Sequence, residues 1–482
     1  MAILTIDQGT TGTTVLLVDH DGLIISKAYH EFTQYYPKPG WVEHDPDEIW
    51  ETVIEGLGEI QDAYSGSIDA IGITNQRETT IIWDAVTGLP VFNAIVWQCR
   101  RTAELCETFT EHREVIRSKT GLPLDAYFSA TKIKWILEHT EVPEGADLRF
   151  GTIDSWLIWK LTQGGTHATD HTNASRTMLY NIHQRCWDRD LCELFGVPLS
   201  ILPEVKDSAS HFGLVKGIEG LDEVPIYGVA GDQQASLFGQ QCFQKGEAKN
   251  TYGTGCFIMM NTGTTAVQST TGLITTLAID PSGKPCYALE GSIFIAGAAV
   301  QWLRDELGLI DKSSDSEAAA LAVPDNGGVY LVPAFVGLGA PHWEMDTRGL
   351  VSGLTRGSNR NHIIRATLES MAYQTLDVVR AMEADTGAAL TVLAVDGGAT
   401  SNDFLMQFQA DVLDRVVARA FQLETTALGA AYLAGLGLGY WTIDELTQLA
   451  GRKTKFNPSM SAEQREQNLQ GWYAAIRKAK CK

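Results

Sequence analysis

Short apolar stretches alternate with longer amphipathic ones along the whole chain. Apolar residues at Ile3–Ile6 and again at Val15–Val18 predict two strands joined by a turn. A third strand is expected over Leu23–Ala28. From Asp47 to Ala63 apolar residues recur every three or four positions, which predicts a helix, and Ile68–Thr74 predicts the next strand. Strands that alternate with helices in this way are typical of an α/β sheet.

The second half repeats this design. Asn250–Gly255 predicts a strand that runs into a turn of glycine and hydroxyl residues, and Cys256–Met260 predicts the returning strand. A long helix is expected over about 361–385 and a strand over 391–395. Another helix follows that strand, and Ser401 is its candidate N-cap. The repeated order indicates weak internal duplication.

The length of 482 residues allows two large α/β domains or about three smaller ones. Because the order of elements repeats once, we predict two domains, 1–245 and 246–482. The join is expected near Gln244–Lys249, just before the second glycine turn, although no Pro/Ser-rich linker marks it.

The charge balance narrows the classes of partner. The chain has 37 Lys and Arg against 59 Asp and Glu, a net charge of −22. Such an acidic chain argues against binding the phosphate backbone of nucleic acid or an anionic membrane surface. No basic segment precedes the first apolar residues, so we expect no signal peptide. The longest uncharged stretches, 250–279 and 425–443, are rich in Gly with Thr and Asn or with Ala, so we expect neither to span a membrane.

The eight cysteines are scattered, and none forms a C-x-x-C pair. This argues against a zinc ribbon or a thioredoxin-like redox site. Reduced thiols and a cytoplasmic location are therefore expected.

The first glycine turn is a candidate phosphate site. Gly9 and Gly12 would let backbone N–H groups approach a phosphate closely, and the hydroxyls of Thr10 and Thr11 would add donors. Asp7, at the end of a strand, can hold Mg²⁺ through water. The alternative is an ordinary hairpin turn with a satisfied aspartate. Neither G-x-x-x-x-G-K-[ST] nor G-x-G-x-x-G occurs, which argues against a P-loop and a Rossmann site.

Two further charged motifs follow predicted strands. Arg77 and Glu78 together can hold vicinal hydroxyls by donor and acceptor contacts, or they can be a surface ion pair. Asp232, beside Gly231 and Gln233, suits a general base, but an N-cap aspartate would have the same sequence setting.

Two other motifs are open to two interpretations. Asp396–Gly398 with Asn402 can present bare backbone to a nucleotide at the start of a helix, or can be a tight turn between a strand and a helix. His167 and His171 have the i, i+4 spacing of a metal-ligand pair on a helix, but no third ligand accompanies them.

Taken together, these segments resemble the FGGY carbohydrate kinases, within the broader fold of sugar kinases, actin and heat-shock ATPases. The resemblance runs from about Leu4 to Trp472 and implies two actin-like (ribonuclease H-like) domains with the active site in the cleft between them. The matching stretches are Asp7–Thr11, Tyr36–Asp45, Gly72–Thr80, Val96–Arg101, Asn173–Thr177, Gly231–Ala235 and Asn250–Cys256.

The resemblance implies ATP-dependent phosphorylation of glycerol, with Asp232 as the base that takes a proton from the terminal hydroxyl. The glycerol site would comprise Arg77, Glu78, Trp97, Tyr127, Asp232, Gln233 and Phe257. The phosphates would face Thr10, Thr11, Gly12, Thr13 and Thr254, and the rest of the nucleotide would lie along Gly297, Gln301, Gly398 and Asn402. Asp7 and Asp232 would share Mg²⁺ through water. A homo-oligomer, dimer or tetramer, is also expected.

The sequence departs from the family pattern in two places. Thr14 stands where many members carry an arginine that meets the nucleotide, which bears on nucleotide affinity rather than on the reaction. The stretch Lys216–Glu223 lacks the glycine-rich, Arg-bearing loop with which some members bind a sugar bisphosphate. It also lacks the histidine that other members expose for phosphorylation, so we predict neither form of control.

Two other functions fit the same fold. A pentulose or tetritol kinase is one, but Arg77 and Glu78 with Trp97 and Phe257 leave little room for a longer substrate. An actin-like ATPase that acts in assembly or as a chaperone is the other, and such a protein has no need of the Asp232–Gln233 pair.

Overall fold

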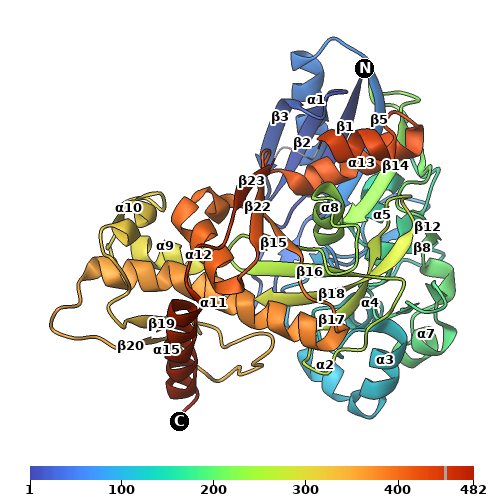
Figure 1. Cartoon of the computed structure of the whole chain (residues 1–482). Helices are drawn as coiled ribbons and strands as arrows, with labels where there is room; N and C mark the ends of the chain where they lie inside the picture. Colours follow the sequence, from blue (N-terminus) through green and yellow to red (C-terminus); the bar gives the residue numbers. More distant parts are fainter. Residues whose placement is uncertain (450–452, 482) are drawn as a thin grey trace.

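Two large mixed sheets dominate the computed structural model, which describes residues 1–449 and 453–481 (Figure 1). The first sheet has the strand order β13-β14-β5-β1-β2-β3. In it, β1 pairs with β2 and β2 with β3 in antiparallel fashion, whereas β5 and β14 run parallel to β1. Its strands are β1 (Ala2–Gln8), β2 (Gly12–Val18), β3 (Ile24–Glu31), β5 (Ile68–Asn75), β13 (Gly213–Leu214) and β14 (Pro225–Gly231).

The second sheet follows the same plan. Strands β15, β16 and β18 pair in antiparallel fashion, and β21 and β22 extend the sheet in the direction parallel to β15. This repeated topology confirms the predicted α/β fold of two similar halves. Its order is β17 (Ile274–Ile279), β18 (Pro285–Ile293), β16 (Cys256–Gly263), β15 (Ala248–Tyr252), β21 (Val392–Asp396), β22 (Val416–Ala420) and β23 (Lys453–Phe456).

Helices cover both sheets, and short two-stranded pairs lie beside them. The helices are α1 (Pro46–Ala63), α2 (Ala103–Glu107), α3 (Arg113–Thr120), α4 (Ser129–His139), α5 (Ile153–Leu161), α6 (His171–Ala174), α7 (Arg189–Phe195), α8 (Asp232–Gly239), α9 (Gly297–Asp305), α10 (Asp315–Leu321), α11 (Arg360–Thr386), α12 (Asp403–Leu413), α13 (Thr425–Leu438), α14 (Ile443–Leu449) and α15 (Ala462–Lys480). The paired short strands are β4 (Glu43–His44) with β7 (Ala94–Ile95), β6 (Ile81–Asp84) with β8 (Leu148–Gly151), β9 (Ala168–Asp170) with β12 (Glu204–Lys206), β10 (Tyr180–Asn181) with β11 (Cys186–Trp187), and β19 (Tyr330–Val332) with β20 (Leu350–Ser352).

Helix α1 illustrates how local sequence fixes an element. Asp45 caps its first turn by accepting from the Asp47 N–H, and Pro46 occupies the first helical position, where its missing N–H costs nothing. The buried side chains of Ile49 and Val53 recur on one face, which packs on β2 and β3.

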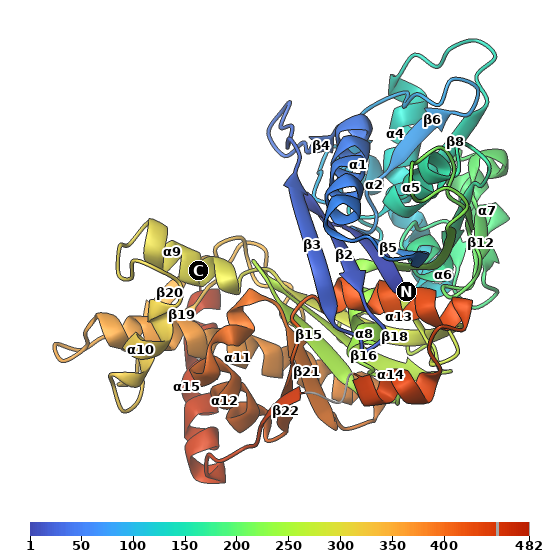
Figure 2. The ribbon, with the colours of Figure 1, turned by 90° about the horizontal axis from the view of Figure 1, so that it is seen from above.

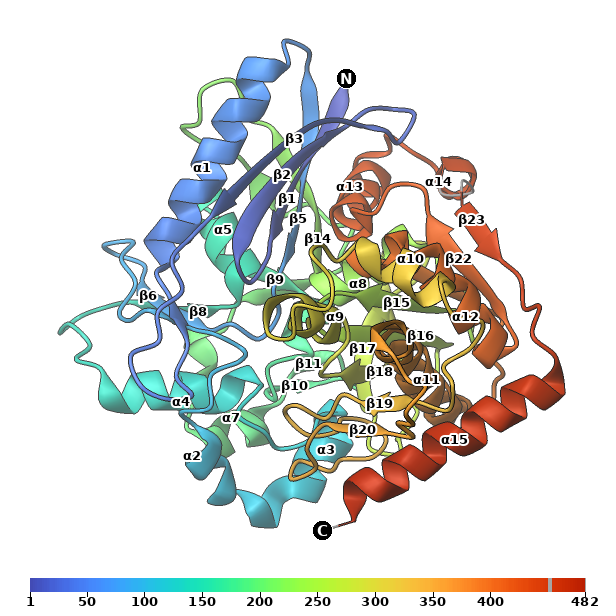
Figure 3. The ribbon, with the colours of Figure 1, turned by 90° about the vertical axis from the view of Figure 1, so that its left-hand side faces the viewer.

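Helix α13 comes from the second half of the sequence but packs on the first sheet, beside α8 (Figure 2, Figure 3). Glycines make this close approach possible. A Cβ atom at Gly72 or Gly228 would lie 2.4 or 2.5 Å from the Ala430 carbonyl oxygen. One at Gly429 would lie 1.9 Å from the carbonyl oxygen of Ala235 on α8. The two helices therefore cross backbone to backbone at the junction of the two sheets.

The structure contradicts the candidate N-cap Ser401 and argues against the metal-pair interpretation of His167 and His171. Helix α12 is capped by Asn402, whose side chain accepts from the Leu405 N–H, because Ser401 lies in a 3₁₀ turn and donates to the Gly398 carbonyl instead. His167 and His171 do not share a helix, because the first precedes β9 and the second begins α6. Their ring nitrogens bond to the Phe150 carbonyl and the Tyr180 hydroxyl.

None of the eight cysteines is in a disulfide. None of the helices in the described ranges combines the length and the apolarity needed to cross a bilayer.

Candidate active site between the two sheets

Parallel strands bring the predicted site residues of the first half to one edge. Strands β1, β5 and β14 run in the same direction, so their carboxyl ends deliver Asp7, Arg77 and Asp232 to the same side of the sheet. The two glycine turns close in the same way: Gly9 donates its N–H to the Gly12 carbonyl at 3.0 Å, and Gly253 donates to the Gly255 carbonyl at 2.9 Å.

Asp232 is the first residue of α8, after the N-cap Gly231. Its Oδ1 accepts from the Gln233 N–H at 2.7 Å and lies 3.0 Å from Arg77 Nε. The side chain remains 31% exposed, in contrast to its neighbours. The carboxylate is thus oriented by one cation and one N–H while one side stays open, which suits a group that receives a proton.

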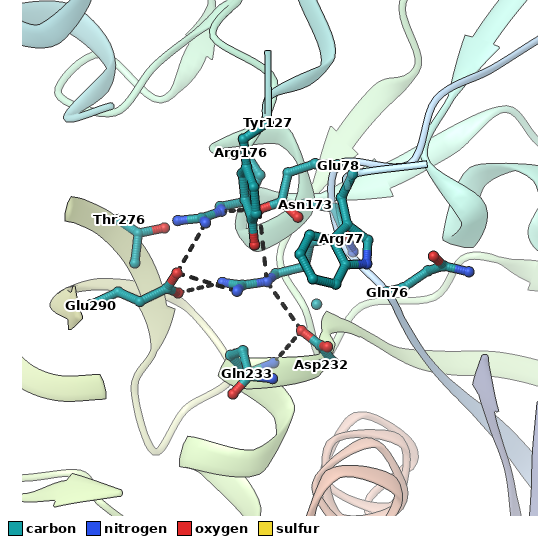
Figure 4. A network of polar contacts seen from close by, with 12 residues as sticks. Gln76, Arg77, Glu78, Tyr127, Asn173, Arg176, Asp232, Gln233, Thr276 and Glu290 are labelled. Carbon is teal, nitrogen blue, oxygen red and sulfur yellow. Dashed lines mark hydrogen bonds and ion pairs between the residues drawn. The ribbon is translucent and has the colours of Figure 1, made fainter. Parts of the chain in front are cut away.

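Arg77 and Glu78 are not a surface ion pair, because both side chains are almost completely buried. Arg77 Nη1 donates to Glu290 Oε2 at 2.5 Å and to Gln234 Oε1 at 3.3 Å. Arg176 donates from Nε to Glu78 Oε1 at 2.5 Å (Figure 4). The two cations and the two glutamates form one buried network.

The pKa values of the two glutamates in this network shift in opposite directions. Burial disfavours the charged form of both. At Glu290 the charges of Arg176 and Arg77 outweigh that penalty and lower the pKa to about 2. At Glu78 burial prevails over the same two cations and raises the pKa above 4.5. Glu290 is therefore the firmly ionised member.

Aromatic side chains form a wall beside this network. The rings of Trp97 and Tyr127 meet edge to face, with centroids 5.4 Å apart. Trp97 Nε1 donates to Thr10 Oγ1 at 3.0 Å, which ties the wall to the first glycine turn. Phe257 is half-buried on β16 of the second sheet, where it pairs with Thr251.

A lysine from the second half of the chain holds the Gln233 side chain. Lys249 on β15, which is fully buried, donates from Nζ to Gln233 Oε1 and, at 2.8 Å, to Thr251 Oγ1. Burial lowers the Lys249 pKa. Because the amide oxygen of Gln233 is engaged, its NH₂ group is the part left for a ligand.

Asp7 carries a carboxylate without a hydrogen-bond donor among the described residues. Burial, and then the negative charges of Asp232 and Glu424, raise its pKa from 3.8 to about 8. The charge of Lys27 acts in the opposite direction, but Lys27 itself pairs with Glu424. The turn is a hairpin between β1 and β2, but no donor of the described residues satisfies the aspartate in it.

A carboxylate without a donor beside a second carboxylate fits a hard divalent cation with oxygen ligands. Within residues 1–449 and 453–481, no three His, Cys, Asp or Glu side chains gather as a ready-made metal site. Asp7 and Asp232 would thus hold Mg²⁺ only together with water and phosphate oxygens, which is the usual manner for this ion.

The predicted phosphate-facing residues of the first turn have different surroundings. Thr11 is exposed and Thr10 half-buried. Gly12 is buried, and a Cβ atom there would lie 2.6 Å from the His30 carbonyl oxygen. Thr13 is fully buried and its hydroxyl bonds to Thr52 of α1 at 2.8 Å. The Thr13 side chain therefore faces α1 and is not available to a ligand.

The five residues expected on the nucleotide from the second half line one cavity of about 620 Å³. Thr254 and Gly297 lie at its side formed by the second glycine turn, where the Gly297 N–H donates to the Gly253 carbonyl. Gly398 and Asn402, just before α12, and Gln301, on α9, line the same cavity. A Cβ atom at Gly398 would meet nothing within 4 Å, so bare backbone faces open space.

Three buried charged residues of the site were not given a role from the sequence. Arg176 lies inside the matching stretch Asn173–Thr177, and Lys249 borders another. Glu290 had a signal of its own, since it is the one charge in the apolar run of β18. A charge in such a strand needs a partner, and here the partners come from the other half of the chain.

Comparison with known proteins shows the family to which this chain belongs. Residues 2–239 match the model for the N-terminal domain of the FGGY family of carbohydrate kinases, and residues 248–438 match that for its C-terminal domain. The glycerol kinase of Petrotoga mobilis is 58% identical over 99% of this chain and 98% of its own length. The glycerol kinase of Fusobacterium nucleatum is 57% identical over 99% of both chains.

Two solved structures of kinases are also similar to this chain in fold. The crystal structure of Plasmodium falciparum glycerol kinase with ADP superposes with a TM-score of 0.94 at 41% identity, covering 100% of this chain and 98% of that one. The ligand-bound xylulose kinase of Lactobacillus acidophilus has a TM-score of 0.89 at 22% identity, over 99% of this chain and 98% of its own, which is a likeness of fold alone.

Proposed function

The chain belongs to the FGGY family of carbohydrate kinases, and on that premise we propose that it transfers the terminal phosphoryl group of ATP to glycerol, giving sn-glycerol 3-phosphate and ADP. Full-length identity of 55–58% to glycerol kinases supports glycerol over other substrates of the family. The observation that carries the proposal is the half-open Asp232, which lies against the buried Arg77–Glu78 network on the strand edge that also bears Asp7.

Glycerol is a neutral triol, so its site must supply hydrogen bonds to hydroxyls and a short apolar surface. In our proposal Arg77, Glu78, Tyr127 and Gln233 bind the hydroxyls, while Trp97 and Phe257 cover the carbon chain. Buried polar groups of this kind reject an analogue that lacks a hydroxyl, because they would be left unpaired.

Asp232 acts in this mechanism as the general base. A primary alcohol is a weak nucleophile, and a carboxylate within hydrogen-bond reach takes its proton as the oxygen attacks phosphorus. The ion pair with Arg77 Nε and the bond from the Gln233 N–H fix the carboxylate, and its exposed side is free for the alcohol.

Charge neutralisation is the other requirement of phosphoryl transfer. We assign the phosphates to Thr10, Thr11 and the backbone of Gly12 on one turn and to Thr254 on the other. The Thr13 contribution is limited to its backbone, since its hydroxyl is committed to Thr52. Mg²⁺, when bound, neutralises phosphate charge, and Asp7 and Asp232 would hold it through water.

The remainder of ATP is assigned to the cavity lined by Gly297, Gln301, Gly398 and Asn402. Nucleotide use is supported by the ADP in the Plasmodium falciparum structure. We also propose a cytoplasmic location, because ATP is the donor and the eight cysteines are free thiols. We also propose a homo-oligomer, dimer or tetramer, which light scattering would test.

One assay tests the proposal. ADP release is measured with glycerol, xylulose, ribulose and erythritol, for the unmodified protein and for Asp232→Asn. Rapid turnover is expected with glycerol alone and is lost in the variant. Faster turnover of a pentulose or erythritol would favour another kinase of this family, and ATP hydrolysis indifferent to every polyol would favour the ATPase alternative. Normal glycerol turnover by Asp232→Asn would overturn the assignment of the base.

A further inference from the structure

We propose, on the basis of the function proposed above, that Glu290 of the second sheet is a positioning residue for the glycerol site of the first. It touches none of the reacting atoms in this mechanism. Its carboxylate lies between the two buried guanidinium groups of that site, Arg77 and Arg176, and both turn toward it (Figure 4).

The contacts are close and shielded from water. Glu290 Oε2 accepts from Arg77 Nη1 at 2.5 Å, and Oε1 accepts from Arg77 Nη2 at 3.3 Å and from Arg176 Nη2 at 3.0 Å. All three side chains are at most 2% exposed. Two-point contact with a planar guanidinium fixes its rotation as well as its place.

That rotation decides what Arg77 offers to the site. Arg77 has five N–H groups. Glu290 takes two of them, Gln234 takes a third, and Nε faces Asp232 at 3.0 Å. One N–H on Nη2 remains for a substrate hydroxyl. Glu290 therefore sets both the direction of the cation toward Asp232 and the single donor left for glycerol.

The guanidinium of Arg176 links Glu290 to Glu78 and so fixes the Glu78 side chain as well. Arg176 binds Glu290 with Nη2 and Glu78 with Nε, at 3.0 and 2.5 Å. Without the Glu290 charge, two adjacent buried cations would lose their shared acceptor. Arg77, whose Nε is already 3.9 Å from Glu78, would then be drawn toward that carboxylate and away from Asp232.

Glu290 and its two arginine partners come from different halves of the chain. Arg77 and Arg176 belong to the first half of the chain, whereas Glu290 stands on β18. The glycerol site is thus complete only when β18 is seated against the first half, while the nucleotide cavity is lined from the second half alone.

The test compares Glu290→Gln with Glu369→Gln in the full-length protein. Glu369 is also a buried, Arg-paired carboxylate, since Arg365 Nε donates to it at 2.8 Å, but it lies on α11 outside the glycerol site. For Glu290→Gln we expect kcat/KM for glycerol to fall about 100-fold, with a raised glycerol KM, because small displacements in a site are costly. The KM for MgATP should stay within about twofold, and Glu369→Gln should keep both values.

A second variant keeps the test decisive if Glu290→Gln does not fold. Glu290→Asp retains the charge but is one methylene shorter, so we expect an intermediate rise in glycerol KM. Unchanged glycerol kinetics in a folded variant would overturn the inference, as would equal losses for glycerol and MgATP, which indicate a general structural role. Failure of the unmodified protein to phosphorylate glycerol would instead overturn the proposed function.

Discussion

Asp7→Asn should make the ligand-free protein more stable at alkaline pH while abolishing its phosphorylation of glycerol. Partial burial, and then the negative charges of Asp232 and Glu424, raise the pKa of the half-buried Asp7 carboxylate to about 8. Its ionisation in the folded state is therefore opposed by its surroundings, and only a bound cation would relieve that cost. Asparagine has nearly the same shape but no charge.

The size and the sign of the effect follow from the pKa. The folded-state value lies above the ordinary 3.8, so folding is favoured while Asp7 is protonated and the benefit is lost as pH rises from about 4 to about 8. Four pKa units correspond to an upper bound of about 6 kcal/mol at pH 9. Because Asp7 is only half-buried, we expect Asp7→Asn to raise the free energy of unfolding by roughly 2 kcal/mol or more at pH 9. Near pH 4 the substitution should not change it.

Urea unfolding at pH 5, 7 and 9, without Mg²⁺ or nucleotide, measures this difference. Asp21→Asn is the matched control, because Asp21 is exposed in the turn between β2 and β3. The prediction is wrong if Asp7→Asn raises the free energy of unfolding at pH 9 by no more than it does at pH 5. It is also wrong if Asp21→Asn raises that free energy by as much. Added MgATP, which brings phosphate oxygens with the cation, should stabilise the unmodified protein more than the variant.

Four further substitutions test separate parts of the site. Asp232→Asn should lower kcat by about 10²–10⁴-fold in steady-state assays while the circular dichroism spectrum stays native. Thr13→Ala should lower the free energy of unfolding by about 1–2 kcal/mol, because it removes a buried hydrogen bond to the Thr52 hydroxyl, which keeps only its bond to the Ile49 carbonyl, and should leave the KM for ATP unchanged; a raised KM would contradict the assignment of that side chain to the fold. Gly297→Ala should raise the KM for ATP, since its Cβ would lie 2.5 Å from the Gly253 carbonyl oxygen, whereas Gly398→Ala should fold with a native melting temperature.

Much of the fold was predictable because periodicity is a local property. The long helix expected over 361–385 is Arg360–Thr386, and that over 47–63 is Pro46–Ala63. The convergence of Asp7, Arg77 and Asp232 was predictable for a related reason, since each follows or ends a strand and parallel strands share an edge.

The parts that were missed depend on contacts across the sequence. Nothing local reveals that Glu290 meets Arg176, because their pairing is set by how the two halves seat on each other. Thr13 was grouped with its neighbours by motif, although alternation along β2 turns it to the opposite face from Thr14. Ser401 failed as a cap because one extra residue is used in a 3₁₀ turn, which has no periodic signal.

The packing of α13 has a consequence for synthesis of the chain. Strand β14 ends at Gly231, but the helix that covers this side of the first sheet begins only at Thr425. As the polypeptide leaves the ribosome, the apolar face that carries Ile3 and Ala70 must wait for almost the whole second half to emerge. During translation the amino-terminal half therefore exposes this apolar face to solvent. The nascent chain at that stage is a natural client for a holding chaperone.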